Sequence, residues 1–203
     1  MKEYMILCLT FFCFTTEAQV TTISPGEIAP DIKLLSVSGK MVSFDDYPAA
    51  KGFIVIFTCN TCPYSKAYEQ RVMALNNKYV SLGFPVIAIN PNDPESSPGD
   101  SFEKMKERAF SKKYTFPYLY DEGQFITTAY GAKNTPHVFV INKTTQGNTI
   151  VYTGAIDNDT PDTNPAKIKY VEDAISALIE NKTPAVIATK AIGCRIVWKK
   201  TNG

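Results

Sequence analysis

Apolar residues follow two different patterns along the chain. Two short runs, Phe53–Phe57 and Pro85–Ile89, are apolar throughout, as expected of strands buried on both faces of a sheet. Between them, apolar residues recur at steps of three and four from Tyr64 to Tyr79, which predicts a helix that Gly83 ends.

The remaining segments complete an alternation of strands and helices. Further strands are expected over 31–37, 41–44, 117–120, 137–141 and 148–154, and further helices around 102–109, 124–130 and 165–180. Pro165 suits the first turn of the last helix. A tail over 185–200 offers a final strand around 196–198. This order predicts an α/β domain whose mixed central sheet carries helices on both faces, with an N-terminal hairpin before it and the tail after it.

Length and charge narrow the class of protein. The 203 residues are enough for one domain with a proper core. Lys and Arg number 21 against 20 Asp and Glu, a net charge of +1. No basic patch indicates a nucleic-acid partner, and no apolar stretch is long enough to span a membrane.

The first eighteen residues have the pattern of a secretory signal peptide. Lys2 precedes a short apolar stretch, and a small residue, Ala18, ends the segment. A buried N-terminal helix and a retained anchor are the alternatives. Cleavage would leave 19–203 as a single domain, with no transmembrane segment, in the periplasm or outside the cell. Of the five cysteines, Cys59, Cys62 and Cys194 would remain.

The pair Cys59 and Cys62 carries the clearest chemistry. It directly follows the apolar run 53–57 and opens the next predicted helix. The partial positive charge at a helix N-terminus stabilises a thiolate, which lowers a cysteine pKa from about 8.5 to ~3.5–7.5. The other cysteine can then attack the mixed disulfide and release the product. A zinc site is the alternative, but it needs about four ligands and the chain has no second C-x-x-C.

Several ordered motifs resemble the thioredoxin-like redoxins, in particular their peroxiredoxin-like branch (alkyl hydroperoxide reductase/thiol-specific antioxidant type). The motifs are 57–66, 88–95, 116–122, 129–132, 135–137 and 193–199. The resemblance implies a thioredoxin fold, no cofactor, and partners that are protein thiols or disulfides together with a separate redox donor.

The resemblance also implies roles for individual residues. Cys59 would attack and Cys62 would resolve, as in thioredoxins. In peroxiredoxins the peroxide-reactive cysteine stands at the position of Cys62, and a Thr usually stands where this chain has Cys59. Thr135-Pro136 resembles the cis-proline of the fold, and the Thr135 backbone would be free to pair with an extended substrate peptide.

Three other side chains are candidates for accessory roles. Lys66 is either a charge that helps hold a thiolate or a solvated helix residue. His137, the only histidine, is either an ordinary strand residue, a proton-transfer group, or a third Cu(I) ligand beside the two cysteines. Cys194 is either a buried inert thiol or an alternative resolving cysteine.

Three functions follow from these residues. The leading hypothesis is an extracytoplasmic thiol–disulfide oxidoreductase that works through Cys59 and Cys62. The second is an antioxidant thiol peroxidase in which Cys62 reacts with hydroperoxides. The third is a non-catalytic Cu(I)-binding module that uses Cys59, Cys62 and His137.

Overall fold

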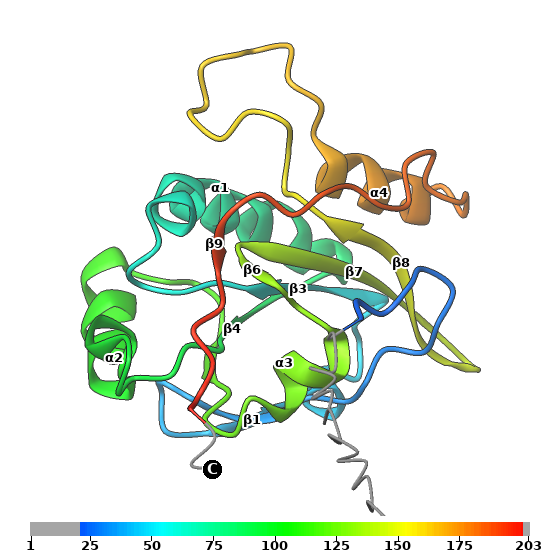
Figure 1. Cartoon of the computed structure of the whole chain (residues 1–203). Helices are drawn as coiled ribbons and strands as arrows, with labels where there is room; N and C mark the ends of the chain where they lie inside the picture. Colours follow the sequence, from blue (N-terminus) through cyan, green and yellow to red (C-terminus); the bar gives the residue numbers. More distant parts are fainter. Residues whose placement is uncertain (1–20, 201–203) are drawn as a thin grey trace, which may run out of the picture.

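A seven-stranded mixed sheet forms the centre of the protein (Figure 1). The computed structural model describes residues 21–200. The strands are β1 (Lys33–Ser36), β2 (Met41–Ser43), β3 (Gly52–Phe57), β4 (Val86–Asn90), β5 (Tyr118–Tyr120), β7 (His137–Thr144) and β8 (Gly147–Gly154). They lie in the order β2-β1-β5-β4-β3-β7-β8. β3, β4 and β5 run parallel, while β1, β7 and β8 add antiparallel pairings, so the mixed sheet and the N-terminal hairpin are confirmed.

Helices cover both faces of this sheet. The helices are α1 (Pro63–Tyr79), α2 (Phe102–Lys112), α3 (Phe125–Tyr130) and α4 (Tyr170–Ile179), with short 3-10 turns at Phe44–Asp46, Val80–Leu82 and Pro98–Asp100. Side chains of β3 alternate between two cores: Ile54 and Ile56 face α1, α2 and α4, while Phe53, Val55 and Phe57 face α3. Burial on both faces explains why β3 is apolar at every position.

The last helix begins later than the sequence predicts. Pro165 was expected in its first turn, but α4 starts at Tyr170. Polar contacts hold the preceding residues in a loop: Asn164 Oδ1 accepts a hydrogen bond from the Ala166 N–H, and Asn158 Oδ1 accepts one from Ile168. Asn side chains compete with helix formation in this way.

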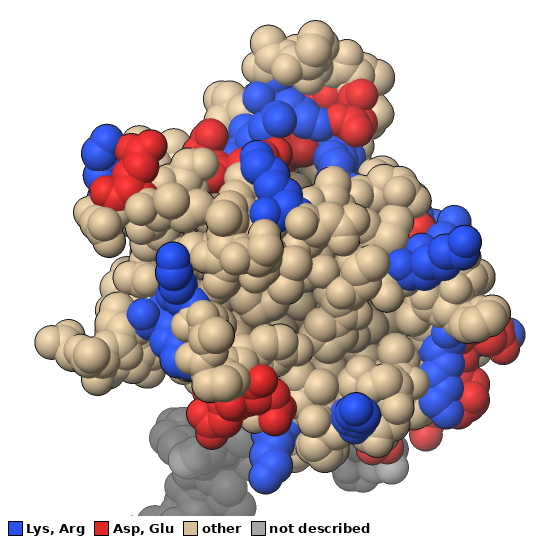
Figure 2. All heavy atoms as spheres, turned by 180° about the vertical axis from the view of Figure 1, so that it is seen from behind, with Lys and Arg blue, Asp and Glu red and all other residues tan. Residues whose placement is uncertain are grey.

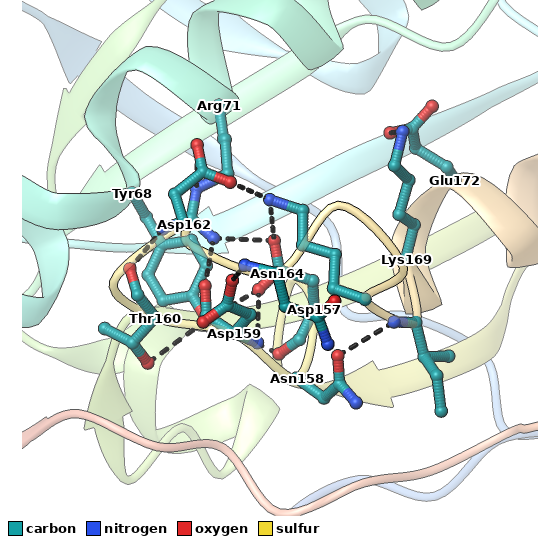
Figure 3. A network of polar contacts seen from close by, with 12 residues as sticks. Tyr68, Arg71, Asp157, Asn158, Asp159, Thr160, Asp162, Asn164, Lys169 and Glu172 are labelled. Atoms are coloured by element: carbon teal, nitrogen blue, oxygen red, sulfur yellow. Dashed lines mark hydrogen bonds and ion pairs between the residues drawn. The ribbon is translucent and has the colours of Figure 1, made fainter.

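A charged network fixes that loop to α1 (Figure 3). Arg71 donates to the Asp157 carboxylate at 2.7 Å and to the Asp159 carbonyl at 2.7 Å, and Tyr68 donates to Asp157 at 3.0 Å. Asp162 pairs with Lys167 of the loop and lies 3.9 Å from Arg71 Nε. Because α1 carries Tyr68 and Arg71, these contacts also fix the orientation of the helix that follows the cysteine pair.

The tail forms a strand two residues earlier than the expected one around 196–198. Its strand is β9 (Cys194–Arg195), and it joins β6 (Asn134–Thr135) in a separate two-stranded sheet instead of extending the main one. In Figure 1 this segment, drawn in red, runs across the sheet beside β6.

The surface charge and the helix lengths can be compared with what the sequence predicts. On the face seen in Figure 2, basic and acidic side chains are interspersed. Among residues 21–200, no helix is both long and apolar enough to cross a membrane. The predicted signal peptide lies outside the described residues.

Candidate active site

The two cysteines of the C-x-x-C lie where the central strand β3 passes into α1. Cys62 is the N-cap of α1, with extended backbone angles (φ −64°, ψ 124°), and Pro63 occupies the first helical position. Proline suits this position because its missing N–H would have no partner there. The structure thus confirms the predicted strand, cysteine pair and helix, and it places the helix terminus at Cys62 in particular.

The short strand β6, between α3 and β7, brings Thr135 against both sulfurs. Cys59 Sγ lies 3.2 Å from Thr135 Oγ1, and Cys62 Sγ lies 3.0 Å from the Thr135 carbonyl oxygen. The Thr135–Pro136 bond is cis, as the sequence motif predicted. The site therefore joins β3, α1 and β6 around two sulfurs.

The Thr135 backbone is not free, contrary to our expectation. Thr135 pairs in antiparallel register with Cys194 of β9, and Asn134 pairs with Arg195. The tail thus occupies the strand edge that we had assigned to a substrate peptide.

Cys194 belongs to the site. Its Sγ lies 2.6 Å from Cys62 Sγ, against about 2.05 Å in a disulfide. All three cysteines are free thiols in this structure. The sequence analysis leaves Cys194 as either a buried inert thiol or an alternative resolving cysteine, and 132 residues separate it from Cys62.

Electrostatics favour Cys62 over Cys59 as the thiolate. Hydrogen bonds from the Cys59 thiol, from the Cys194 thiol and from the Ser65 N–H of the first helical turn lower the pKa of Cys62 to about 4, against the opposing effect of burial. The same hydrogen bond with Cys62, together with burial and the nearby Asp100 charge, raises the pKa of Cys59 well above its ordinary value. We had expected Cys59 to be the nucleophile.

A buried carboxylate supports the loop between the two cysteines. Asp100 accepts hydrogen bonds from the backbone N–H groups of Asn60 at 2.6 Å and Thr61 at 3.3 Å, and from the Thr61 hydroxyl at 2.7 Å. Asn92 and Ser97 also donate to it. The sequence analysis missed Asp100, although the turn-rich stretch after β4 marks the segment that carries it.

The imidazole of His137 forms its hydrogen bonds with groups other than the cysteine sulfurs. One ring nitrogen hydrogen-bonds the Thr153 hydroxyl at 3.1 Å, and the other accepts the Lys133 N–H at 3.4 Å. Burial, helped by the Lys133 charge, lowers the pKa of His137 to about 4, so the ring is neutral near pH 7. The interpretation of His137 as a strand residue fits these contacts, and its roles in proton transfer and copper binding do not.

The side-chain geometry supports neither a thiolate-stabilising role for Lys66 nor a metal site. Lys66 is exposed on α1 and forms no ion pair with another residue of the described range. Within residues 21–200, no group of three or more His, Cys, Asp and Glu side chains is arranged to hold a metal ion.

Comparisons with known proteins point to the same chemistry. The chain is 26% identical over 128 residues to the thiol-disulfide oxidoreductase ResA of Geobacillus thermodenitrificans (strain NG80-2), covering 61% of this chain and 66% of that protein. It is 26% identical over 141 residues, 70% of this chain and 83% of the relative, to the "Putative peroxiredoxin MT2597" of Mycobacterium tuberculosis (strain CDC 1551 / Oshkosh).

Solved structures confirm the fold. An uncharacterized conserved protein from Geobacillus kaustophilus matches with a TM-score of 0.80 at 34% identity, over 87% of this chain and 93% of that one. A thioredoxin-like protein solved in its oxidised form matches at 18% identity with a TM-score of 0.59, over 78% of this chain and 97% of that one. The thioredoxin fold is therefore confirmed. The model of the AhpC/TSA family matches residues 25–150, and the chain belongs to that family.

Proposed function

We propose that the protein is a thiol–disulfide oxidoreductase that works through Cys59 and Cys62. The observation that carries this proposal is a cysteine at the N-terminus of α1 whose pKa is lowered to about 4, in hydrogen-bond contact with a second cysteine. The family and the named relatives indicate oxidoreductase activity.

The electrostatics support a different role for each of the two cysteines. The Cys62 thiolate attacks one sulfur of a disulfide, a Cys62 mixed disulfide forms, and the other sulfur leaves as a thiolate. Cys59 then attacks Cys62, the Cys59–Cys62 disulfide forms, and the proton of Cys59 goes to the second leaving thiolate. A separate thiol donor returns the pair to the reduced state, so the reaction needs no cofactor.

The proposed place of action is outside the cytoplasm, in the periplasm or the extracellular space. Its support is the signal-like pattern of residues 1–18, which would leave 19–203 as one domain. Sequencing the N-terminus of the exported protein tests it: a mature chain that begins near Gln19 supports export, and an intact Met1 in the cytoplasm opposes it.

Reduction of a protein disulfide tests the activity. With dithiothreitol as donor, the wild-type protein should accelerate reduction of insulin, Cys62→Ser should reduce the rate to background, and Cys59→Ser should lower the rate. Thr144→Ala, at the exposed end of β7, is the control and should keep the full rate. Full activity in Cys62→Ser would contradict the assignment.

A thiol peroxidase is the second candidate, because Cys62 both stands at the peroxide-reactive position of the family and has the lowered pKa. Its thiolate would take one oxygen from a hydroperoxide to give a sulfenic acid and an alcohol, and Cys59 would then form the disulfide and release water. Peroxide consumption that Cys62→Ser abolishes would support this candidate. Absence of peroxide-dependent turnover in the wild type would eliminate it.

A further inference from the structure

The last part of the chain is fastened at two places, one on each side of Cys194. We call residues 185–200 the C-terminal strap (Figure 1). Upstream, the Thr189 N–H donates to the Thr153 carbonyl at 2.9 Å, and the Thr189 hydroxyl accepts the Ala155 N–H at 3.0 Å. These hydrogen bonds attach the strap at Thr189 to the end of β8.

The downstream attachment lies on the loop after β4 and at the start of α3. The Val197 N–H donates to Asn92 Oδ1 at 2.9 Å, and the Val197 carbonyl accepts hydrogen bonds from Asp93 N–H and Gln124 Nε2, both at 2.9 Å. Ile196 is buried in the core beside α3. With both sides fixed, Cys194 has little freedom to move away from Cys62.

Gly193 allows the strap to approach Thr135 closely. A Cβ at this position would lie 2.2 Å from the Thr135 carbonyl oxygen, where no side chain fits. The close approach lets Cys194 pair with Thr135. This pairing brings the Cys194 sulfur next to the Cys62 sulfur. Cys194 thus lies where the cysteine of a bound peptide would lie.

The three sulfurs differ in their access to solvent. Cys59 and Cys62 are only 4% and 2% exposed, whereas Cys194 is partly exposed. A partner protein that meets the closed structure can reach Cys194 and cannot reach the buried pair. Cys194 also touches the one sulfur through which the pair exchanges.

We propose that Cys194 is a third redox-active cysteine, through which the buried Cys59–Cys62 pair exchanges disulfides with thiols or disulfides of outside partners. The proposal rests on the exchange function proposed above and adds the route by which the partner is reached.

The relay consists of three exchanges, each of which forms one S–S bond and breaks one. Cys194 attacks a partner disulfide, and its proton goes to the partner sulfur that leaves, which becomes a thiol. The Cys62 thiolate then attacks Cys194, and the second partner sulfur leaves as a thiolate. Finally Cys59 attacks Cys62, the Cys59–Cys62 disulfide forms, and the proton of Cys59 returns to the Cys194 sulfur. The same steps in reverse oxidise a partner dithiol.

Disulfide mapping after trypsin digestion tests the central step. Cys59 and Cys62 share the peptide 52–66, while Cys194 lies in the peptide 191–195. Cys59→Ser treated with oxidised glutathione should yield these two peptides joined by a Cys62–Cys194 disulfide. Cys62→Ser should not yield them joined. Persistent glutathione adducts without the joined peptides in Cys59→Ser would overturn the proposal.

Gly193→Ala, made in the Cys59→Ser background, tests the geometry. It keeps Cys62 and Cys194 but pushes the strap from Thr135, so the joined peptides should form more slowly. Ile192→Ala, at the exposed neighbouring position, is the matched control and should leave their formation unchanged. Equal rates in Gly193→Ala and Ile192→Ala would contradict the role of the strap.

A rate measurement separates this proposal from the general one. In a single turnover, reduced Cys194→Ser should reduce a protein disulfide at least about tenfold more slowly than wild type, because a sulfur held in contact reacts as if highly concentrated. Its Cys59–Cys62 pair should still form a disulfide reversibly in glutathione buffers. An unchanged or faster turnover would mean that the strap only covers the site. If the wild type fails to reduce the disulfide, the exchange function itself is wrong.

Discussion

Asp100→Ala is expected to lower the free energy of unfolding by roughly 3–5 kcal/mol, because buried donors lose a charged acceptor and regain no water. Asp100 is fully buried, and its carboxylate accepts from the backbone of Asn60 and Thr61 and from the side chains of Asn92 and Ser97. The substitution should also slow disulfide exchange, since the backbone between the two cysteines loses its support.

Urea unfolding of the reduced protein measures the effect on stability, and the insulin assay measures the effect on exchange. Asp100→Asn keeps the shape and one acceptor oxygen, so its loss of stability should be smaller. Asp45→Ala removes an exposed carboxylate and serves as the control, with a change within about 0.5 kcal/mol. An unfolding midpoint of Asp100→Ala equal to that of wild type would show that the carboxylate does not hold the loop.

The Cys62 thiolate should persist in mildly acidic solution. With its pKa at about 4, Cys62 is ionised above that pH and becomes protonated as the pH falls through it. At pH 6 its thiolate fraction should exceed that of a free cysteine, with a pKa of about 8.5, by roughly 300-fold. In the reduced protein, the stability that this shift contributes is complete above the ordinary cysteine pKa and is lost as the pH falls through about 4.

Thiolate absorbance in the ultraviolet measures this titration without requiring a reagent to reach the buried sulfur. The difference between reduced wild type and Cys62→Ser should show a step near pH 4. Cys59→Ala removes the donor with the largest effect and should move the step to higher pH. Cys194→Ser keeps a hydrogen-bond donor at residue 194, so it should move the titration step less than Cys194→Ala does. A step near pH 8.5 in the wild type would contradict the assignment of Cys62 as the thiolate.

Local patterns were enough to predict the frame of the site. β3 is apolar throughout because both of its faces are buried, and the cysteine pair that follows it marks the turn into α1. Pro63 and Gly83 mark the start of α1 and the turn after it for reasons that are local in the chain. The cis bond at Pro136 was predicted through the family motif alone.

Contacts between distant segments could not be read from such patterns. The place of Cys194 depends on anchors at Thr189 and Val197, whose partners come from β8 and from the loop after β4. Asp100 became part of the site only because its turn folds beneath Asn60 and Thr61. The start of α4 was misplaced because Asn158 and Asn164 hold residues 166–168 in a loop by side-chain hydrogen bonds.

The reversible oxidation of the Cys59–Cys62 pair is the most direct test of the account. The reduced protein would be equilibrated in glutathione buffers of graded potential, its free thiols would be trapped, and the peptide 52–66 would be examined by mass spectrometry. The account predicts a single reversible transition in which this peptide gains an internal disulfide, and the transition midpoint gives the reduction potential of the pair. A peptide 52–66 that keeps both thiols free across the whole range would contradict the account.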